Sequence, residues 1–366
     1  MRPRSHAVSD GSSSFRACQI HRRGSRTLGV GLSALTMLAA TSLAACASTT
    51  PANRLTVMTR NMDEGTDFGP LVKAKTYGQF LTAAATAWEE VEASDIPQRA
   101  AGIADEIVAA KPDLVSIEEA SVWRTGPLLG SASTVIYDAL ASLLKALAAD
   151  DAKYRLVAIE PEFDLEGPTS LGYDVRVNDE DAILARSDLR LSGMRSGHFH
   201  NELTLTPVGV TETILRGWTS VDVMVGGKTV RYVETHLESF SNSVQKAQAG
   251  ELLAGPAHTT LPVILGCDCN TGPGVTPTYR YLLSKGGFTD TWTVTNPNSR
   301  GFTWPLHKED PYVATATPTE RIDLVLVRGA ITPVTDKLIG NTHASLTTSG
   351  LWPSDHAGVL ATLTVN

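Results

Sequence analysis

The 366-residue sequence has few cysteines, few charged residues and few aromatic residues. Four cysteines in a chain of this length exclude a small scaffold built on disulfide bonds. Charged residues make up 19% of the chain and hydrophobic residues 42%, which excludes a disordered chain and a coiled coil. The chain also lacks a repeat period. With 366 residues, 42% of them hydrophobic, the chain is long enough and apolar enough for one large globular domain or two ordinary ones.

Several common catalytic motifs are absent as well. The sequence contains no Gly-x-Ser-x-Gly elbow, no His-Glu-x-x-His and no P-loop. The segment Asp268-Cys-Asn-Thr-Gly272 lacks the later ligands and the closing glutamate of an EF-hand. These absences exclude the usual serine hydrolase, zinc peptidase and P-loop nucleotide sites.

The first 45 residues have the pattern of a secretory signal. A basic start that ends at Arg26 is followed by an apolar stretch from Leu28 to Ala45, and Leu43-Ala44-Ala45-Cys46 resembles a bacterial lipobox. The alternative is a transmembrane helix, but about 18 mostly small residues are at the lower limit for spanning a bilayer. We expect a lipoprotein signal peptide over 1–45, lipidation of Cys46, a flexible tether over 46–53 and an extracytoplasmic, membrane-anchored protein.

The mature chain is predicted to be acidic. Residues 1–45 hold six of the 31 basic residues and one of the 39 acidic residues, which leaves a net charge of −13 for residues 46–366. Such a chain does not bind nucleic acid through its total charge, although a local basic groove is still possible.

Residues 54–366 alternate between β-branched runs and helical patterns and predict one α/β domain. The predicted strands are 55–59, 114–117, 155–159, 182–185, 220–225, 229–234, 262–265, 322–327 and 359–365. The predicted helices are 77–93, 97–110, 135–149 and 243–254, with Ser94 or Asp95 as the cap of the second. Gly226-Gly227 predicts a hairpin, whereas 65–94 and 270–320 are expected to be insertions that shape a cleft.

Polar clusters stand at the ends or starts of six of these strands, where side chains of buried strands tend to converge on one rim. A single cluster of this kind is often an ordinary turn, but six together favour a site. Acidic and amide oxygens without paired cysteines favour a hard cation, Mg²⁺ or Mn²⁺, over zinc. Histidines beside carboxylates suit proton transfer. Cys267 and Cys269 are expected to be small buried side chains, because a bridge between residues two apart on a strand is strained.

The ordered set of motifs resembles the endonuclease/exonuclease/phosphatase superfamily, and it spans residues 54–366. The segments that carry the resemblance are Met58–Asn61, Pro112–Glu119, Ala182–Arg186, Thr235–Leu237, Asp268–Asn270, Arg321–Asp323 and Ser354–His356. The resemblance implies a four-layered α/β sandwich, in which two packed, mainly antiparallel sheets are flanked by helices. It also implies hydrolysis of phosphate esters with a divalent metal.

Carried over by position, the resemblance implies two groups of site residues. The metal would be held by Glu119, Asn61, Asp355 and Asp63. The catalytic residues would be His236, Asp268, Asn270, Asp323 and His356. Asp268 and Asn270 would position or activate the attacking water, Asp323 would orient His356, and His236 would donate to a phosphate oxygen.

This sequence departs from the family pattern at several positions. Cys267 replaces a glycine, Glu234 replaces an asparagine, and Glu118 stands where glutamine is frequent. An acid that supports His236 could lie among residues 179–181, but we interpret that acidic trio as a solvated loop. Arg216 and Arg321 are candidate phosphate ligands, as is Arg186 with less support, and each has the alternative of a surface charge.

The predicted function is hydrolysis of a phosphodiester by in-line attack of water. A general phosphodiesterase or nuclease is the first candidate. The alternatives are a lipid phosphodiesterase similar to a sphingomyelinase, which cleaves a phospholipid head group, and an inositol or sugar phosphatase. An alternative of another class is a surface lipoprotein that binds a ligand without turnover. The tryptophans at 123, 218, 292 and 304 could stack on a substrate, but buried packing is the commoner role of tryptophan.

Overall fold

The computed structural model describes residues 53–307 and 317–366. By internal contacts the chain divides into two units, residues 1–48 and 49–366, and all of the described residues belong to the second. The predicted signal peptide, Cys46 and most of the tether lie outside the described residues. Among the described helices, none has the combination of length and apolar character that crossing a bilayer requires.

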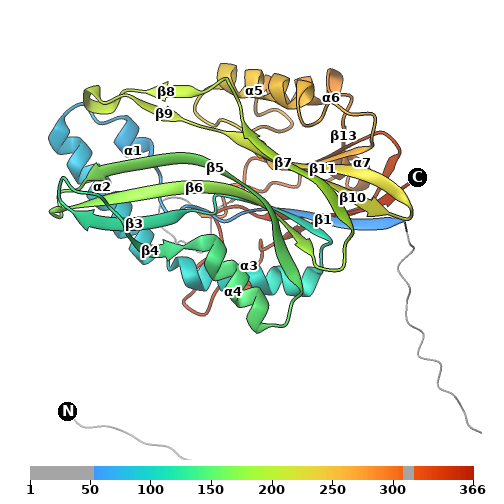
Figure 1. Cartoon of the computed structure of the whole chain (residues 1–366), viewed down its shortest axis with the longest axis horizontal. Coiled ribbons are helices and arrows are strands. Elements are labelled where there is room, and N and C mark those ends of the chain that lie inside the picture. The colour runs from blue at the N-terminus through green and yellow to red at the C-terminus, as the bar shows by residue number, and fades with distance from the viewer. Residues whose placement is uncertain (1–52, 308–316) are drawn as a thin grey trace, which may run out of the picture. The chain divides into compact units, whose positions relative to one another are not determined.

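Two large sheets form the centre of the domain (Figure 1). The first has the strand order β15-β16-β1-β2-β6-β3-β4, with β5 also paired to β6. Its strands are β15 (Ile331–Ile339), β16 (Gly358–Val365), β1 (Arg54–Asn61), β2 (Leu114–Glu118), β6 (Tyr173–Arg186), β3 (Val122–Pro127), β4 (Thr134–Asp138) and β5 (Tyr154–Pro168).

The second sheet has the order β13-β14-β12-β11-β10-β7, and a separate hairpin pairs β8 with β9. Its strands are β13 (Thr289–Asp290), β14 (Asp323–Arg328), β12 (Val263–Asp268), β11 (Lys228–His236), β10 (Gly217–Val225) and β7 (Leu191–His198), and the hairpin is β8 (Leu203–Leu205) with β9 (Glu212–Ile214). In each sheet one central pair is parallel, β1 with β2 and β11 with β12, and the other pairs are antiparallel.

Helices cover the outer faces of both sheets (Figure 1). They are α1 (Gly69–Val72), α2 (Tyr77–Ala93), α3 (Ile96–Ala110), α4 (Ala139–Ala149), α5 (Asn242–Ala254), α6 (Pro277–Ser284) and α7 (Thr291–Thr295), with short 3₁₀ turns at Pro207–Gly209 and His343–Ser345. Side chains cap several of their N-termini. Asp95 accepts a hydrogen bond from the backbone of Gln98 at the start of α3, which confirms one of the two predicted caps.

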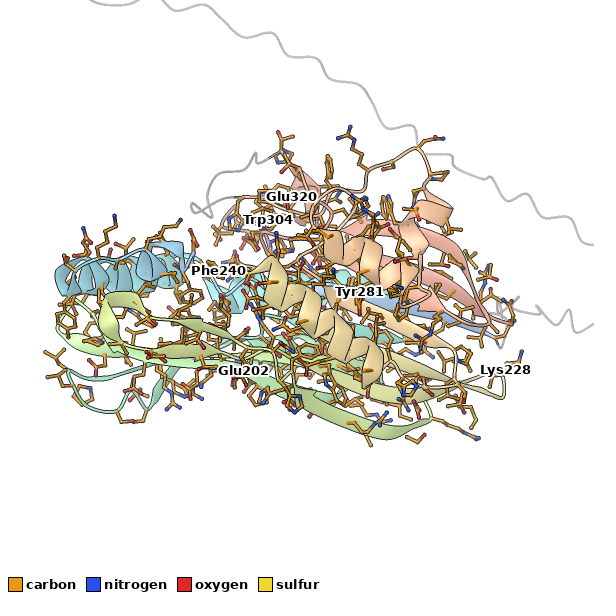
Figure 2. The ribbon with its side chains drawn as sticks, turned by 90° about the horizontal axis from the view of Figure 1, so that it is seen from above. Glu202, Lys228, Phe240, Tyr281, Trp304 and Glu320 are labelled. Atoms are coloured by element: carbon orange, nitrogen blue, oxygen red, sulfur yellow. A yellow bond between two sulfur atoms is a disulfide. The ribbon has the colours of Figure 1, made fainter. Side chains whose placement is uncertain are left out.

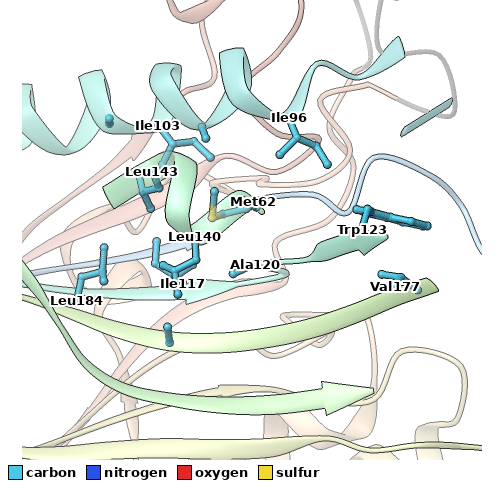
Figure 3. Close-up of a cluster of buried hydrophobic side chains, with 14 of the residues drawn as sticks. Met62, Ile96, Ile103, Ile117, Ala120, Trp123, Leu140, Leu143, Val177 and Leu184 are labelled. Carbon is cyan, nitrogen blue, oxygen red and sulfur yellow. The ribbon is translucent and has the colours of Figure 1, made fainter. Parts of the chain in front are cut away.

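The core is layered in the same way. Helix α3 places Ile96, Ile103 and Ile107 on one face, at helical spacing, and Figure 3 shows Ile103 beside Leu143 of α4 above Ile117 of β2. A second cluster, which includes Val57, Val221 and Ile264, fills the space between the sheets. A third lies between the second sheet and helices α5 and α6. The predicted four-layered sandwich is therefore confirmed.

Most predicted elements are present, and one predicted helix has the wrong start. The predicted helix 135–149 begins only at Ala139, because Asp138 caps it and residues Thr134–Asp138 form β4 instead. The expected insertion over 65–94 contains α1 and the predicted helix 77–93, which is α2. The hairpin at Gly226-Gly227 is confirmed, with both glycines at positive φ between β10 and β11.

The expectation of free thiols at Cys267 and Cys269 is also wrong, because the two residues form a disulfide. Strand β12 ends at Asp268, so Cys269 already lies in the turn that leads to Asn270, whose φ is +47°. The turn brings the two Cα atoms to 5.1 Å, within the range that a disulfide can bridge. The argument against a bridge assumed an extended strand through Cys269, and that assumption fails.

Candidate active site

The six polar clusters meet at one edge of the two sheets. Because β1 and β2 are parallel, their carboxyl ends lie together, and Asn61 pairs in register with Glu118. The same holds for β11 and β12, where His236 is opposite Asp268. Strand β14 runs antiparallel to β12, so its first residue, Asp323, faces Asp268 at the same edge.

Residues 354–356 also lie at this edge, because they precede a strand that is antiparallel to β1. They immediately precede β16, which is antiparallel to β1. The start of β16 therefore lies beside the end of β1. Sheet topology thus brings together side chains from residue 61 to residue 356.

Asp268 is at the centre of the assembled group. Its Oδ2 atom lies 3.1 Å from Asn61 Nδ2, 3.5 Å from His236 Nε2 and 3.7 Å from His356 Nε2. The Asp268 side chain is fully buried, and burial raises the pKa of its carboxyl to about 6, although the nearby His356 lowers it. One carboxylate oxygen therefore faces both histidines.

His356 is held as a cation by its acidic neighbours. Its Nδ1 atom lies 2.9 Å from Asp323 Oδ2, and its Nε2 atom lies 3.7 Å from Asp355 Oδ1. Burial lowers the pKa of the His356 imidazole, but Asp323, Asp355 and Asp268 together raise it well above its usual value. The ring therefore carries a proton on each nitrogen, with Nδ1–H donated to Asp323.

His236 is held neutral instead. Burial and the adjacent Arg216 guanidinium lower its pKa well below the usual value, and His356 adds to this effect. Nδ1 accepts a hydrogen bond from Arg216 Nη1 at 2.8 Å, so the single ring proton is on Nε2, which lies 3.0 Å from Asn270 Nδ2 and 3.5 Å from Asp268 Oδ2. The two histidines thus differ in charge although both are buried.

Glu119 belongs to a group that could hold a metal ion, because its ligand atom and those of His236 and Asp268 lie within 4.8 Å of one another. Burial and the charge of Asp355 raise the pKa of Glu119 to about 8, and burial raises that of Asp355 as well. Because the charge of Asp355 disfavours ionisation of Glu119, a hard cation bound there would be favourable, and carboxylate oxygens fit Mg²⁺ or Mn²⁺. Glu119 also has a φ of +57°, which turns its side chain out of the line of β2. The residues present therefore fit the predicted metal.

Asn61 and Asp63 have protein partners in this structure. The Asn61 amide donates to Asp268 and accepts from the backbone N–H of Asp63. The Asp63 carboxylate lies 3.3 Å from Arg99 Nη1 and 3.4 Å from His307 Nε2, and the Arg99 charge holds its pKa below the usual range despite burial. Metal ligation by Asn61 and Asp63 stays a prediction.

The three arginine candidates lie in different surroundings. Arg216 lines the active-site cavity, is buried, and lies 3.6 Å from Asp179 Oδ2. Arg321 makes a bidentate ion pair with Asp290, at 3.0 and 2.7 Å, and is not among the described residues that line the cavity. Arg186, the last residue of β6, forms ion pairs with Asp113 and Asp188 and does not line the cavity. Only Arg216 is therefore placed to meet a phosphate in the cavity.

A group of buried carboxyl groups lies beneath the site and was not predicted. It consists of Glu118, Glu162, Asp179, Asp181 and Glu234, all at most 1% exposed. Burial raises the pKa of each of them. The solvated-loop interpretation of 179–181 is wrong, since these residues belong to β6. Strand alternation turns Asp179 and Asp181 inward and Glu180 toward the other face.

The site residues open into one cavity of about 880 Å³, which Glu119, His236, Asp268, Asn270 and His356 all line. Phe240 and Trp304 also line the cavity. In Figure 2, Phe240 lies between the blue helices α1 and α2 and the start of α5, and Trp304 lies beside Glu320. The Trp304 indole N–H donates to Asp355 Oδ2 at 2.8 Å, whereas Trp123 and Trp292 are buried.

No protein-family model matches the sequence, and no curated protein is a significant match to it. Solved structures do match. An endonuclease/exonuclease/phosphatase from Beutenbergia cavernae DSM 12333 is 22% identical with a TM-score of 0.55, over 86% of this chain and 72% of that one. An endonuclease/exonuclease/phosphatase from Bacteroides vulgatus is 14% identical with a TM-score of 0.54, and the match covers 86% of this chain and 99% of that one. TDP2 of D. rerio, in a structure complexed with a single strand DNA product, is 16% identical with a TM-score of 0.50. The match covers 85% of this chain and 99% of that one. This chain thus has the endonuclease/exonuclease/phosphatase fold.

Proposed function

We propose that this protein is an extracytoplasmic, lipid-anchored phosphodiesterase that depends on Mg²⁺ or Mn²⁺. The proposal combines the fold, which it shares with endonuclease/exonuclease/phosphatase proteins, with the chemistry of the cavity. The observation that carries it is the position of Asp268, whose Oδ2 atom lies within 3.7 Å of two histidines of opposite protonation state.

The proposed reaction is in-line attack of water on phosphorus. A divalent cation bound by Glu119 and Asp355 would supply positive charge for the phosphate oxygens. Asp268 accepts the proton of the attacking water, because His356 already carries its proton and cannot act as a base. His356, oriented by Asp323, stabilises the charge that develops on the phosphate as the bond to the leaving oxygen breaks.

Hydrolysis of bis-p-nitrophenyl phosphate with Mg²⁺, Mn²⁺ or EDTA tests this proposal. We expect metal-dependent release of p-nitrophenolate by the full chain. Asp268→Asn and His356→Gln should each lower kcat by about 10²-fold or more, since each removes a proton-transfer or charge-stabilising group.

Matched controls separate chemistry from folding. Asp105→Asn and His258→Gln change exposed residues of the same types and should leave kcat unchanged. Activity that survives in both site variants would contradict the assigned site. A protein that is folded but inactive with every metal and ester would favour the alternative of a ligand-binding lipoprotein.

The membrane anchor is a separate part of the proposal and rests on the lipobox-like sequence at Cys46. We expect Cys46→Ser to move the protein from the membrane pellet to the supernatant of a bacterial host, with phosphodiesterase activity retained. A variant that stays in the pellet without detergent would contradict lipidation at Cys46.

Nucleic acid is a second candidate substrate. It is supported by a solved structure of similar fold, TDP2 of D. rerio, that is complexed with a single strand DNA product. Release of acid-soluble nucleotides from plasmid DNA and from RNA, compared with hydrolysis of a phospholipid head group and of inositol phosphates, would rank the candidates.

A further inference from the structure

The active-site cavity has an apolar arm that the catalytic residues do not use. One wall of the arm comes from Phe68 beside α1, Leu71 of α1 and Phe80 of α2. The facing wall comes from Phe163 of β5 and, on the hairpin, Ile214 of β9. Figure 1 shows α1 and α2 at the same end of the domain as β8 and β9. We call this part of the cavity the apolar arm.

The apolar arm begins at the catalytic centre. The guanidinium carbon of Arg216, which contacts His236, lies 6.0 Å above the centre of the Phe163 ring. The Phe163 ring in turn packs edge-on against Phe68 at 5.8 Å. Phe68, Leu71 and Phe80 remain partly exposed although they are apolar. A continuous apolar surface therefore leads from the phosphate position outward, and its exposure costs free energy unless a ligand covers it.

The charges around the cavity do not suit a polyanion. Among the described residues, nine carboxyl residues line the cavity, with one arginine and no lysine. A nucleic-acid strand needs several Lys or Arg contacts to its phosphates. The whole cavity, about 880 Å³, is within the range of roughly 300–1,000 Å³ that is typical of small-molecule sites. Both features favour a small substrate with a single phosphodiester.

We propose that the apolar arm binds a hydrocarbon chain that is esterified to the phosphate which the site cleaves. This inference rests on the proposed phosphodiesterase function and names its substrate class: amphiphilic phosphodiesters with one negative charge and an alkyl substituent. The phosphate lies at Arg216 and the histidines, and the alkyl chain lies along Phe163 toward Leu71 and Phe80.

A series of p-nitrophenyl alkyl phosphates with methyl, butyl and octyl chains tests the inference, because the leaving group is the same throughout. Burial of each methylene should raise kcat/KM about fourfold until the arm is filled, mainly through a lower KM. Methyl and octyl esters hydrolysed with equal kcat/KM would overturn the apolar arm and leave the phosphodiesterase function intact.

Binding without turnover keeps the test valid if the protein proves inactive. Calorimetry in EDTA compares the affinities of the methyl and octyl esters directly. A lower Kd for the octyl ester supports the arm even where hydrolysis is absent, whereas equal Kd values overturn it. Failure of the phosphodiesterase function and failure of the arm are therefore separate results.

Variants of α1 and α2 locate the chain-binding surface, and the control is on α2. Ala84→Phe adds a ring to a residue that lines the arm, and Leu71→Asp places a charge in it. Both should bring kcat/KM for the octyl ester down to that for the methyl ester, with the methyl ester affected less than threefold. Thr86→Phe, on the exposed face of the same helix, should change neither. Folded variants, judged by Tm, that retain the octyl preference would overturn the assignment.

Discussion

Glu119 links metal binding to pH at the scale of a single residue. Burial and Asp355 raise the pKa of its carboxyl to about 8. A cation must displace that proton, so binding releases protons below this pH. We expect the Kd for Mg²⁺ to fall about tenfold per pH unit from pH 6 to about 8 and then to level off. Calorimetry checks this, and Glu119→Gln should bind weakly with little dependence on pH. A constant Kd in the unchanged protein would contradict the prediction.

Glu234 is a second residue with a measurable effect. Its Oε2 atom accepts a hydrogen bond from Thr219, but Oε1 has no hydrogen-bond partner. Burial, Asp181 and Glu118 raise its pKa, so the folded state binds more protons than the unfolded state. The stability associated with this proton is therefore present at low pH and lost as pH rises through the folded pKa.

Replacing the Glu234 carboxyl by an amide should remove the loss of stability that accompanies a rise in pH. We expect Glu234→Gln to raise the free energy of unfolding by about 1–3 kcal/mol at pH 8 and to change it little at pH 4. Urea denaturation at the two pH values measures the difference. Exposed Glu202→Gln is the control, and a variant that is less stable at pH 8 would show that the carboxylate has a favourable partner there.

Helix α3 supports the site through one side chain at the scale of the element. Arg99 is fully buried and donates to the carbonyl oxygens of Met62, Asp63 and Ser94. It also pairs with the Asp63 carboxylate at 3.3 Å. It therefore fixes the segment that follows β1 and contains Asp63, one of the predicted metal ligands.

Loss of this guanidinium should weaken both fold and activity. We expect Arg99→Met to lower the free energy of unfolding by about 3–5 kcal/mol, because Asp63 is left buried without its charge partner. Chemical denaturation and the Mg²⁺ dependence of phosphodiester hydrolysis are the measurements. Arg155→Met, at an exposed position, is the control. Equal stability of the two variants would contradict this role.

The sequence predicted those elements whose local chemistry agrees with their place in the fold. Runs such as Leu114–Ile117 are mostly apolar, with β-branched Val115 and Ile117, because both faces of the strand are buried. Strand β4 was missed because Val135–Tyr137 continues directly into a helical pattern, and only the cap at Asp138 separates the two. The first half of β6 was missed because its acidic residues have the composition of a loop.

The site was predictable to the extent that it depends on strand ends. Residues such as Asn61, His236 and Asp268 follow buried strands, and parallel pairing brings such ends together. The buried carboxyl groups could not be predicted, because an isolated carboxylate is costly to bury and acidic runs are usually solvated. The partner of each buried carboxyl group depends on contacts between the two sheets. The local sequence pattern carries no information about those contacts.

At the scale of the whole molecule, the net negative charge of the predicted mature chain disfavours binding of nucleic acid. The predicted mature chain has a net charge of −13, and its cavity has one arginine among the described lining residues. We expect no retention of plasmid DNA on a filter at 150 mM salt. We also expect a small slope of log affinity against log salt at lower concentrations, because few counterions are released. Tight binding with a steep slope would contradict this expectation and favour the nuclease alternative.

The pairing of β1 with β16 joins the two ends of the domain, since Arg54 lies opposite Thr364 and Thr59 opposite Val359. His356 and Asp355 stand just before this last strand, whereas Asn61 ends the first. A ribosome therefore has to finish nearly the whole polypeptide before the catalytic groups can meet. Under the export proposed above, a chain threaded outward would complete its site only after its final residues have crossed the membrane.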